Sequence, residues 1–255
     1  MRPFTIISLL GVALWPPVSA IVNGIEASAV DYPYMAGVLS SGIFNDAFFC
    51  GGVVIGKRTV LTAASCLEEL FAQLSAKQLK VRVGSANHSQ GGTVVPVSKI
   101  IRHPNWDRAT LNADYAILHL RQDALVTAAL LPETDPASTN GLAVRVAGWG
   151  RQDYTSVTTP KMLQTADMLI VDRSTCNSAW KDINPITPTM ICVSSNEAMP
   201  GTSVCQGDNG GPIVDEARLT LYGVVSLNAK CSAAPRPNIA SSVFKVKGWI
   251  EQNLI

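Results

Sequence analysis

Short hydrophobic runs of three to five residues recur along most of the chain, and turn residues such as Gly, Pro, Asn and Asp separate them. Val, Ile and Leu dominate these runs, and the β-branched residues among them favour pleated strands. Dense runs of this length at uneven spacing are typical of an all-β sandwich or barrel. The runs that carry this prediction are 52–55, 59–61, 80–83, 93–97, 116–120, 143–146 and 222–225.

Helical periodicity is scarce by comparison. It is present at 67–79 and in the tail at 246–254, and each of these segments could form a short surface helix. The segment 130–141, LLPETDPASTNG, has the polar and proline-containing composition of a connection between two halves. The pattern therefore predicts one all-β domain, or a close pair of domains, with little helix.

The start of the chain has the pattern of a signal peptide. Arg2 is followed by an apolar run at 6–15, by two prolines, and by Val18, Ser19 and Ala20. We expect residues 1–20 to be removed by cleavage after Ala20. A membrane anchor is the alternative, but ten apolar residues are too few to span a bilayer. No later stretch approaches 18 apolar residues, so we expect a secreted protein without a membrane span.

Charge excludes one class of partner. The chain has 20 basic and 19 acidic residues, and Arg2 is lost with the predicted signal peptide. The remaining chain is formally neutral, which gives no support to binding nucleic acid or an anionic membrane through bulk charge.

Six cysteines follow the predicted cleavage site, and an even number in an exported chain suggests three disulfides. Six cysteines allow 15 connectivities, and counting does not choose among them. There is no Cys-x-x-Cys, and none of the three histidines is near a cysteine, so we expect no metal site. One glycosylation sequon stands at Asn87, in the sequence Asn-His-Ser.

Nine short strings occur in an order that resembles the trypsin/chymotrypsin family of serine proteases, over the whole region after residue 20. Any one of them is a weak signal, but their order and spacing together are specific. They are IVNG at 21–24, YPY at 32–34, CGG at 50–52, VLTAASC at 60–66, DYAIL at 114–118, AGWG at 147–150, MIC at 190–192, CQGDNGGP at 205–212 and WI at 249–250.

The resemblance implies two packed six-stranded antiparallel β-barrels of the chymotrypsin-like kind, with an active site in the crevice and a C-terminal helix. It places the N-terminal barrel at about 21–130, the C-terminal barrel at about 141–243 and the helix at about 244–255. It also implies three disulfides, Cys50–Cys66, Cys176–Cys192 and Cys205–Cys231.

The chain departs from the family at two of the three catalytic positions. The family's histidine position is Ser65 and its serine position is Asn209, whereas its aspartate position keeps Asp114. An Asn amide is not a usable nucleophile, and a Ser hydroxyl is not a base near neutral pH. His88, His103 and His119 are the only imidazoles, and the resemblance places none of them at the site. We therefore expect an inactive homologue, which is not an enzyme, in which Asp114 is satisfied by Ser226 and by backbone N–H groups.

Other family positions are kept or altered. The resemblance implies that the Ile21 ammonium pairs with Asp208 and orders the loop of Gly207, a remnant of the oxyanion hole. The specificity pocket would have Ser203 at its base, and Asn228 and Asn238 would narrow or fill it. The calcium loop of the family matches 85–92, which contains no carboxylate, so we expect no calcium and no cofactor.

Two functions from different classes remain open. The first is a secreted, monomeric homologue that binds an extracellular protein or glycan, as a hydrolase inhibitor, decoy or immune cofactor. Its candidate contact loops are 40–49, 150–160, 194–203 and 232–238. The alternative is a weakly active chymotrypsin-like endopeptidase with an unconventional centre. A structural or storage role is a third possibility.

Overall fold

The N-terminal half of the chain forms a closed β-barrel. We describe residues 21–42, 46–68, 75–228, 230–232 and 236–255 of a computed structural model of the chain, so the predicted signal peptide lies outside the described residues. The barrel order is β2-β3-β4-β7-β6-β5, with antiparallel neighbours throughout. Residues alternate between core and surface in β5, as the Val-rich pattern predicts. The strands are β2 (Met35–Ser40), β3 (Ala47–Gly56), β4 (Thr59–Thr62), β5 (Leu79–Val83), β6 (Thr93–Arg102) and β7 (Ala116–Leu120).

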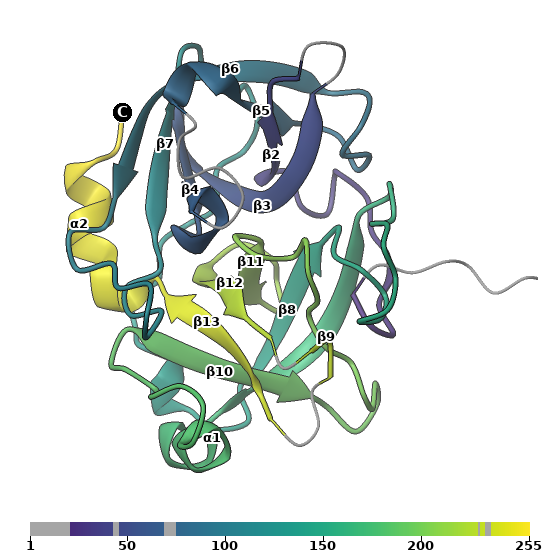
Figure 1. The fold of residues 1–255 in the computed structure, drawn as a ribbon, viewed down its shortest axis with the longest axis vertical. Coiled ribbons are helices and arrows are strands. Elements are labelled where there is room, and N and C mark those ends of the chain that lie inside the picture. The colour runs from purple at the N-terminus through teal and green to yellow at the C-terminus, as the bar shows by residue number, and fades with distance from the viewer. Residues whose placement is uncertain (1–20, 43–45, 69–74, 229, 233–235) are drawn as a thin grey trace, which may run out of the picture.

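The C-terminal half forms a second barrel below the first in Figure 1. Its strands follow the order β9-β10-β13-β12-β11-β8, and pairing of β9 with β8 closes the ring. The short β1 (Ile25–Glu26) adds to β9. The prediction of two six-stranded antiparallel barrels is confirmed. The other strands are β8 (Ala143–Gly148), β9 (Gln164–Val171), β10 (Met190–Ser195), β11 (Pro212–Asp215), β12 (Leu221–Leu227) and β13 (Asn238–Ser242).

Helices are few and short among the described residues. The prediction of a helix over 67–79 falls partly on 69–74, which lie outside the described residues. In the rest of this range, η1 (Ser65–Leu67) ends at Leu67, η2 (Ala76–Gln78) is a short 3-10 helix, and β5 begins at Leu79. The predicted C-terminal helix is present as η4 (Phe244–Val246) and α2 (Lys247–Gln252). The segment 130–141 connects the two barrels and contains η3 (Pro136–Ser138). Sequence reasoning missed α1 (Arg173–Trp180), which the Asp172 side chain caps by accepting a hydrogen bond from Thr175 N.

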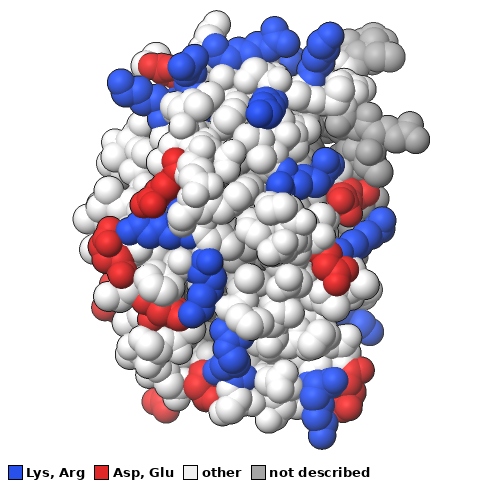
Figure 2. All heavy atoms as spheres, turned by 90° about the vertical axis from the view of Figure 1, so that its left-hand side faces the viewer, with Lys and Arg blue, Asp and Glu red and all other residues white. Residues whose placement is uncertain are grey.

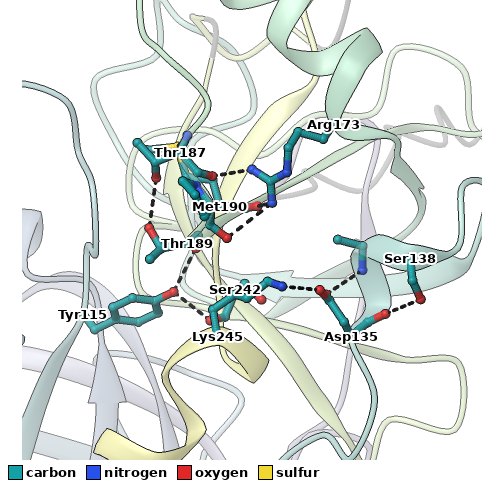
Figure 3. A network of polar contacts seen from close by, with 11 residues as sticks. Tyr115, Asp135, Ser138, Arg173, Thr187, Thr189, Met190, Ser242 and Lys245 are labelled. Carbon is teal, nitrogen blue, oxygen red and sulfur yellow. Dashed lines mark hydrogen bonds and ion pairs between the residues drawn. The ribbon is translucent and has the colours of Figure 1, made fainter.

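Tyr115 joins the two barrels. Its hydroxyl lies 2.7 Å from the carbonyl oxygen of Ser242 and 2.9 Å from that of Thr189, at the end of β13 and the start of β10 (Figure 3). Arg173 of α1 donates to main-chain carbonyls around the same turn, including that of Met190 at 3.0 Å. Because Tyr115 is buried and bonded across the interface, its neighbour Asp114 is held at the junction of the barrels.

Three disulfides connect the cysteines as the resemblance implied. They attach β3 to η1, α1 to β10, and the 205–211 loop to the segment after β12. Each could contribute roughly 3 kcal/mol to stability by restricting the unfolded chain. The pairs are Cys50–Cys66, Cys176–Cys192 and Cys205–Cys231.

The side of the molecule that carries α2 has mixed charge. Figure 2 shows Lys and Arg interspersed with Asp and Glu on this side. Lys245 pairs with Asp135 at 2.6 Å and Lys247 with Glu133 at 2.7 Å. None of the helices in the described ranges is long and apolar enough to cross a membrane.

Candidate functional site

Asp114 lies at the centre of the site, directly before Tyr115 and β7, and its side chain is fully buried. Its Oδ1 accepts the backbone N–H of Ser65 at 2.7 Å, and its Oδ2 accepts the hydroxyls of Ser65 at 2.8 Å and of Ser226 at 2.6 Å. Burial raises the pKa of this carboxyl, and the hydrogen bonds from Ser226 and Ser65 oppose that rise. The carboxylate therefore has the Ser226 and backbone partners that the sequence predicted, together with the hydroxyl of Ser65.

Asn209 lies on the other side of Ser226. Its Nδ2 donates to the main-chain oxygen of Ser226 at 3.0 Å, which fixes the orientation of the amide because a carbonyl only accepts. Its Oδ1 is buried and has no hydrogen-bond partner. The three positions Ser65, Asp114 and Asn209 are thus brought together through Ser226, and Asn209 Oδ1 is enclosed without a hydrogen-bond partner among the described residues.

The three histidines lie elsewhere. His88 stacks on Phe48 with ring centroids 4.6 Å apart, and burial lowers its pKa. His103 packs against Trp249, and burial lowers its pKa too. Nε2 of His119 is 2.8 Å from the main-chain oxygen of Asn253. No described contact joins an imidazole to Ser65 or Asn209, so the site holds a hydroxyl–carboxylate pair in place of a serine–histidine pair.

Asp208 is buried beside two glycines. It accepts the backbone N–H of Gly150 at 2.7 Å and that of Cys205 at 2.8 Å. A Cβ on Gly148 or Gly150 would lie within 2.3 Å of its carboxylate oxygens, so only glycine fits at these two positions. Burial raises the pKa of Asp208 to about 7, because the described residues supply no cation to this carboxylate.

The Ile21 side chain is fully buried in the C-terminal core, and Val22 N donates to Ser203 O at 2.9 Å. This anchors the start of the predicted mature chain beside the loop of Asp208. Gly207, the predicted oxyanion-loop remnant, has a φ of 101° and lines the cleft. The ion pair between Ile21 and Asp208 remains a prediction, with a pH-dependent test.

A chain that begins at Ile21 is expected to keep its stability from pH 4 to pH 8, because its ammonium stabilises ionised Asp208. In a chain with Ala20 retained, burial holds the pKa of folded Asp208 at about 7, above the ordinary aspartate pKa of 3.8. Its stability is then greatest below about pH 4 and falls by about 1.4 kcal/mol per pH unit toward pH 7. Urea unfolding at several pH values measures this difference.

The control is Asp208→Asn, which should remove the difference in slope between the two chains. Identical pH profiles of the Ile21 and Ala20 chains, with Asp208 intact, would show that no such ion pair forms.

The residues predicted to form the specificity pocket lie at different depths. Ser203 and Asn238 are both buried, and the Ser203 hydroxyl donates to Asn238 Oδ1 at 2.9 Å. Neither residue lines the cleft between the barrels, whereas Asn228 does, with its Oδ1 accepting Cys231 N at 3.0 Å. The narrowing of the pocket by the two asparagines remains a prediction.

Asn87 of the sequon is half-buried in the loop between β5 and β6. Its Oδ1 accepts the backbone N–H of Ser89 at 2.9 Å and the Ser89 hydroxyl at 2.8 Å. Its glycosylation remains a prediction.

A cleft of about 1070 Å³ lies between the barrels over Ser65, Asn209 and Ser226. Its walls come from both halves: Phe48 and Phe49 from β3, Arg108 from the loop after β6, residues of the loop at 151–159, and residues 226–228 and 230 at and after the end of β12. Two of the four loops that the sequence proposed as contact loops, 40–49 and 150–160, therefore supply walls of the cleft.

The arrangement of cleft, barrels and disulfides has a match among known proteins. The family model described as Trypsin matches residues 21–250. The chain belongs to the trypsin family. Trypsin-family relatives include Trypsin 5G1 of Aedes aegypti, 31% identical over 91% of this chain and 84% of that one, and Trypsin beta of Drosophila erecta, 33% identical over 91% and 88%.

Two further similarities extend this trypsin-family match. The vitellin-degrading protease of Bombyx mori is 29% identical over 98% of this chain and 92% of its own length. The solved structure of neuropsin, a serine protease expressed in the limbic system of mouse brain, superposes with a TM-score of 0.77 at 26% identity. The superposition covers 91% of this chain and 99% of the neuropsin chain.

These comparisons contradict the expectation that this trypsin-family chain is not an enzyme. Two of its relatives are named as trypsins and a third as a protease. The chain is therefore assigned to the family of trypsin-like serine proteases. The expectation also considered only an imidazole as the base. The structure shows a hydroxyl and a carboxylate in direct contact, Ser65 Oγ and Asp114 Oδ2. Ser65 and Asn209 remain the residues at the two family positions, and they determine what chemistry the site can use.

Proposed function

We propose that this trypsin-family protein acts outside the cell by binding an extended polypeptide in the cleft between its barrels. The observation that carries the proposal is a cleft of about 1070 Å³ with apolar side chains from both barrels on its walls, Phe48 and Phe49 from one and Tyr154 and Val157 from the other. An extended polypeptide fits a hollow of this kind because its side chains can pack against both walls.

The rim of the cleft favours contact with side chains. Tyr154 is 54% exposed and Val157 is 84% exposed, and both line the cleft beside half-buried Phe48 and Phe49. Exposed apolar side chains gathered around a hollow are typical of binding surfaces. A polypeptide offers apolar side chains that can pack against those on the rim of the cleft.

The predicted pocket limits the depth of the complex. Ser203 and Asn238 are buried, bonded to each other and absent from the cleft lining, so they are not available to a side chain that enters the cleft. We therefore expect the bound segment to lie across the cleft, with a small residue above Asn228.

Peptide-bond hydrolysis is the second candidate, and the names of the relatives favour it. The centre would be Ser65 Oγ as nucleophile and Asp114 as base, 2.8 Å apart. A carboxylate is a weaker base than imidazole, so its rate would fall far below that of a Ser-His-Asp triad. Turnover that is lost in Ser65→Ala would identify this centre.

Selection of a random decapeptide library on the chain that begins at Ile21, followed by fluorescence anisotropy, tests the proposal. We expect selected peptides to bind, and Tyr154→Ala combined with Val157→Ala to raise Kd about tenfold, since burial of two apolar side chains contributes a few kcal/mol at most. Mass spectrometry of the same samples reports any cleavage.

The matched control is Val30→Ala combined with Leu125→Ala, because both residues are 88% exposed and neither lines the cleft. Failure to select any peptide, or equal weakening by the two double variants, would overturn the proposal.

A further inference from the structure

Three cations line the cleft, and they come from both barrels. Arg108 lies on the loop after β6, whereas Arg151 and Lys230 lie on loops of the C-terminal barrel. Among the described residues that line the cleft there is no Asp or Glu. The cleft is therefore positive although the chain from Ile21 onward has equal numbers of basic and acidic residues.

None of the three cations forms an ion pair with a described residue: the ion pairs do not include Arg108, Arg151 or Lys230. Lys230 Nζ lies 5.9 Å from the ring centroid of Tyr154, which brings a cation and an aromatic ring together at one place on the rim. Elsewhere in the protein, cations such as Lys245 and Lys247 are paired with carboxylates.

The acids that neighbour these cations in sequence do not line the cleft. Asp107 accepts hydrogen bonds from Ala109 N and the Thr110 hydroxyl, both at 2.9 Å. Asp153 accepts the backbone N–H groups of Thr155 and Ser156, both at 2.8 Å. Each carboxylate is thus held within its own loop, and the charged side chains among the described lining residues are all cations.

We infer that the polypeptide bound in this cleft is acidic, with Asp or Glu side chains interspersed among hydrophobic ones. This inference rests on the proposed function and adds the chemistry of the ligand. Unpaired cations on both walls attract and orient a negatively charged segment, and a basic segment is repelled. A sulfated glycan would also satisfy the cations, but exposed Tyr154 and Val157 favour a ligand with apolar side chains.

Three peptides of one design test the charge. Each has eight residues, with hydrophobic residues alternating with Glu, Gln or Lys at the same positions, and each is titrated by fluorescence anisotropy at low and high NaCl. The Glu peptide should bind at least tenfold more tightly than the Gln peptide at low salt, and the Lys peptide should bind most weakly. Salt screens charges, so the preference should shrink at high NaCl.

Matched variants locate the effect. Arg108→Gln, Arg151→Gln and Lys230→Gln together should abolish the preference for the Glu peptide. Lys57→Gln, Lys99→Gln and Arg121→Gln together change the net charge equally, at exposed cations that do not line the cleft, and should leave the preference intact. Circular dichroism confirms that both triple variants are folded.

The possible outcomes separate this inference from the proposed function. Equal binding of the Glu and Gln peptides overturns the inference and leaves polypeptide binding standing. Binding of none of the three peptides, together with failure of the library selection, overturns both. A heparin oligosaccharide that binds through the three cleft cations, when the Glu peptide does not bind, overturns the polypeptide assignment in favour of a glycan.

Discussion

Replacing Ser65 by His and Asn209 by Ser in the same chain is expected to raise peptide hydrolysis by several orders of magnitude. Asp114 is already fixed at the junction of the barrels and faces position 65, as the acid of a Ser-His-Asp triad must. In a protease of another fold, losing the serine or the histidine alone costs about as much as losing the whole triad, roughly a millionfold. Each single variant should therefore stay close to the parent chain.

The measurement is kcat/KM on fluorogenic peptides with Ala at the cleavage position, because we expect Asn238, buried and bonded to Ser203, to narrow the pocket for long side chains. Asp114→Asn in the background of the double variant is the control and should lower the restored rate strongly. A folded double variant that hydrolyses no faster than the two single variants would show that the site has lost more than these two side chains.

Asp114→Ala is expected to cost about 3 kcal/mol or more of unfolding free energy, because each buried donor left without an acceptor costs about 1–3 kcal/mol. The substitution leaves the Ser65 N–H and the hydroxyls of Ser65 and Ser226 without their acceptor in the core. Asp114→Asn keeps one acceptor oxygen and should cost less. Asp182→Ala, at an exposed carboxylate, should change stability little. Chemical denaturation measures all three.

The sign of the pH dependence follows from burial. Burial raises the pKa of folded Asp114 above that of an exposed aspartate. Its contribution to stability is therefore fully present below the pKa of the unfolded chain, and it falls as pH rises through the folded pKa. The cost of Asp114→Ala should therefore be greatest in acid. A change of less than about 1 kcal/mol at every pH would show that Asp114 has no such structural role.

Local patterns in the sequence predict the strands well and the helices poorly. Runs of β-branched residues mark β5 and β6, in which buried residues alternate with more exposed ones over at least part of the strand, and a short apolar run marks β7, whose five residues are all buried. Helix α1 escapes notice because only Cys176 and Trp180, four residues apart, are buried on it. The periodicity at 67–79 is interrupted by β5, which begins at Leu79 because this residue pairs with Ser40 of β2.

The site shows where sequence reasoning ends. Family motifs identify Ser65, Asp114 and Asn209, but Asp114 and Asn209 are joined through Ser226, which lies 112 positions from Asp114 along the chain. No local pattern predicts that the Asn209 amide bonds Ser226 and leaves its own oxygen unpaired. The gathering of Arg108, Arg151 and Lys230 around one cleft likewise depends on how the two barrels pack.

Hydrogen–deuterium exchange with and without the Glu peptide tests the central claim, that a polypeptide binds in the cleft between the barrels. The account predicts slower exchange at 151–159, 206–211 and 226–228, and unchanged exchange in α2. Slower exchange confined to α2 or to the hairpin at 215–221, with these three segments unchanged, would contradict it.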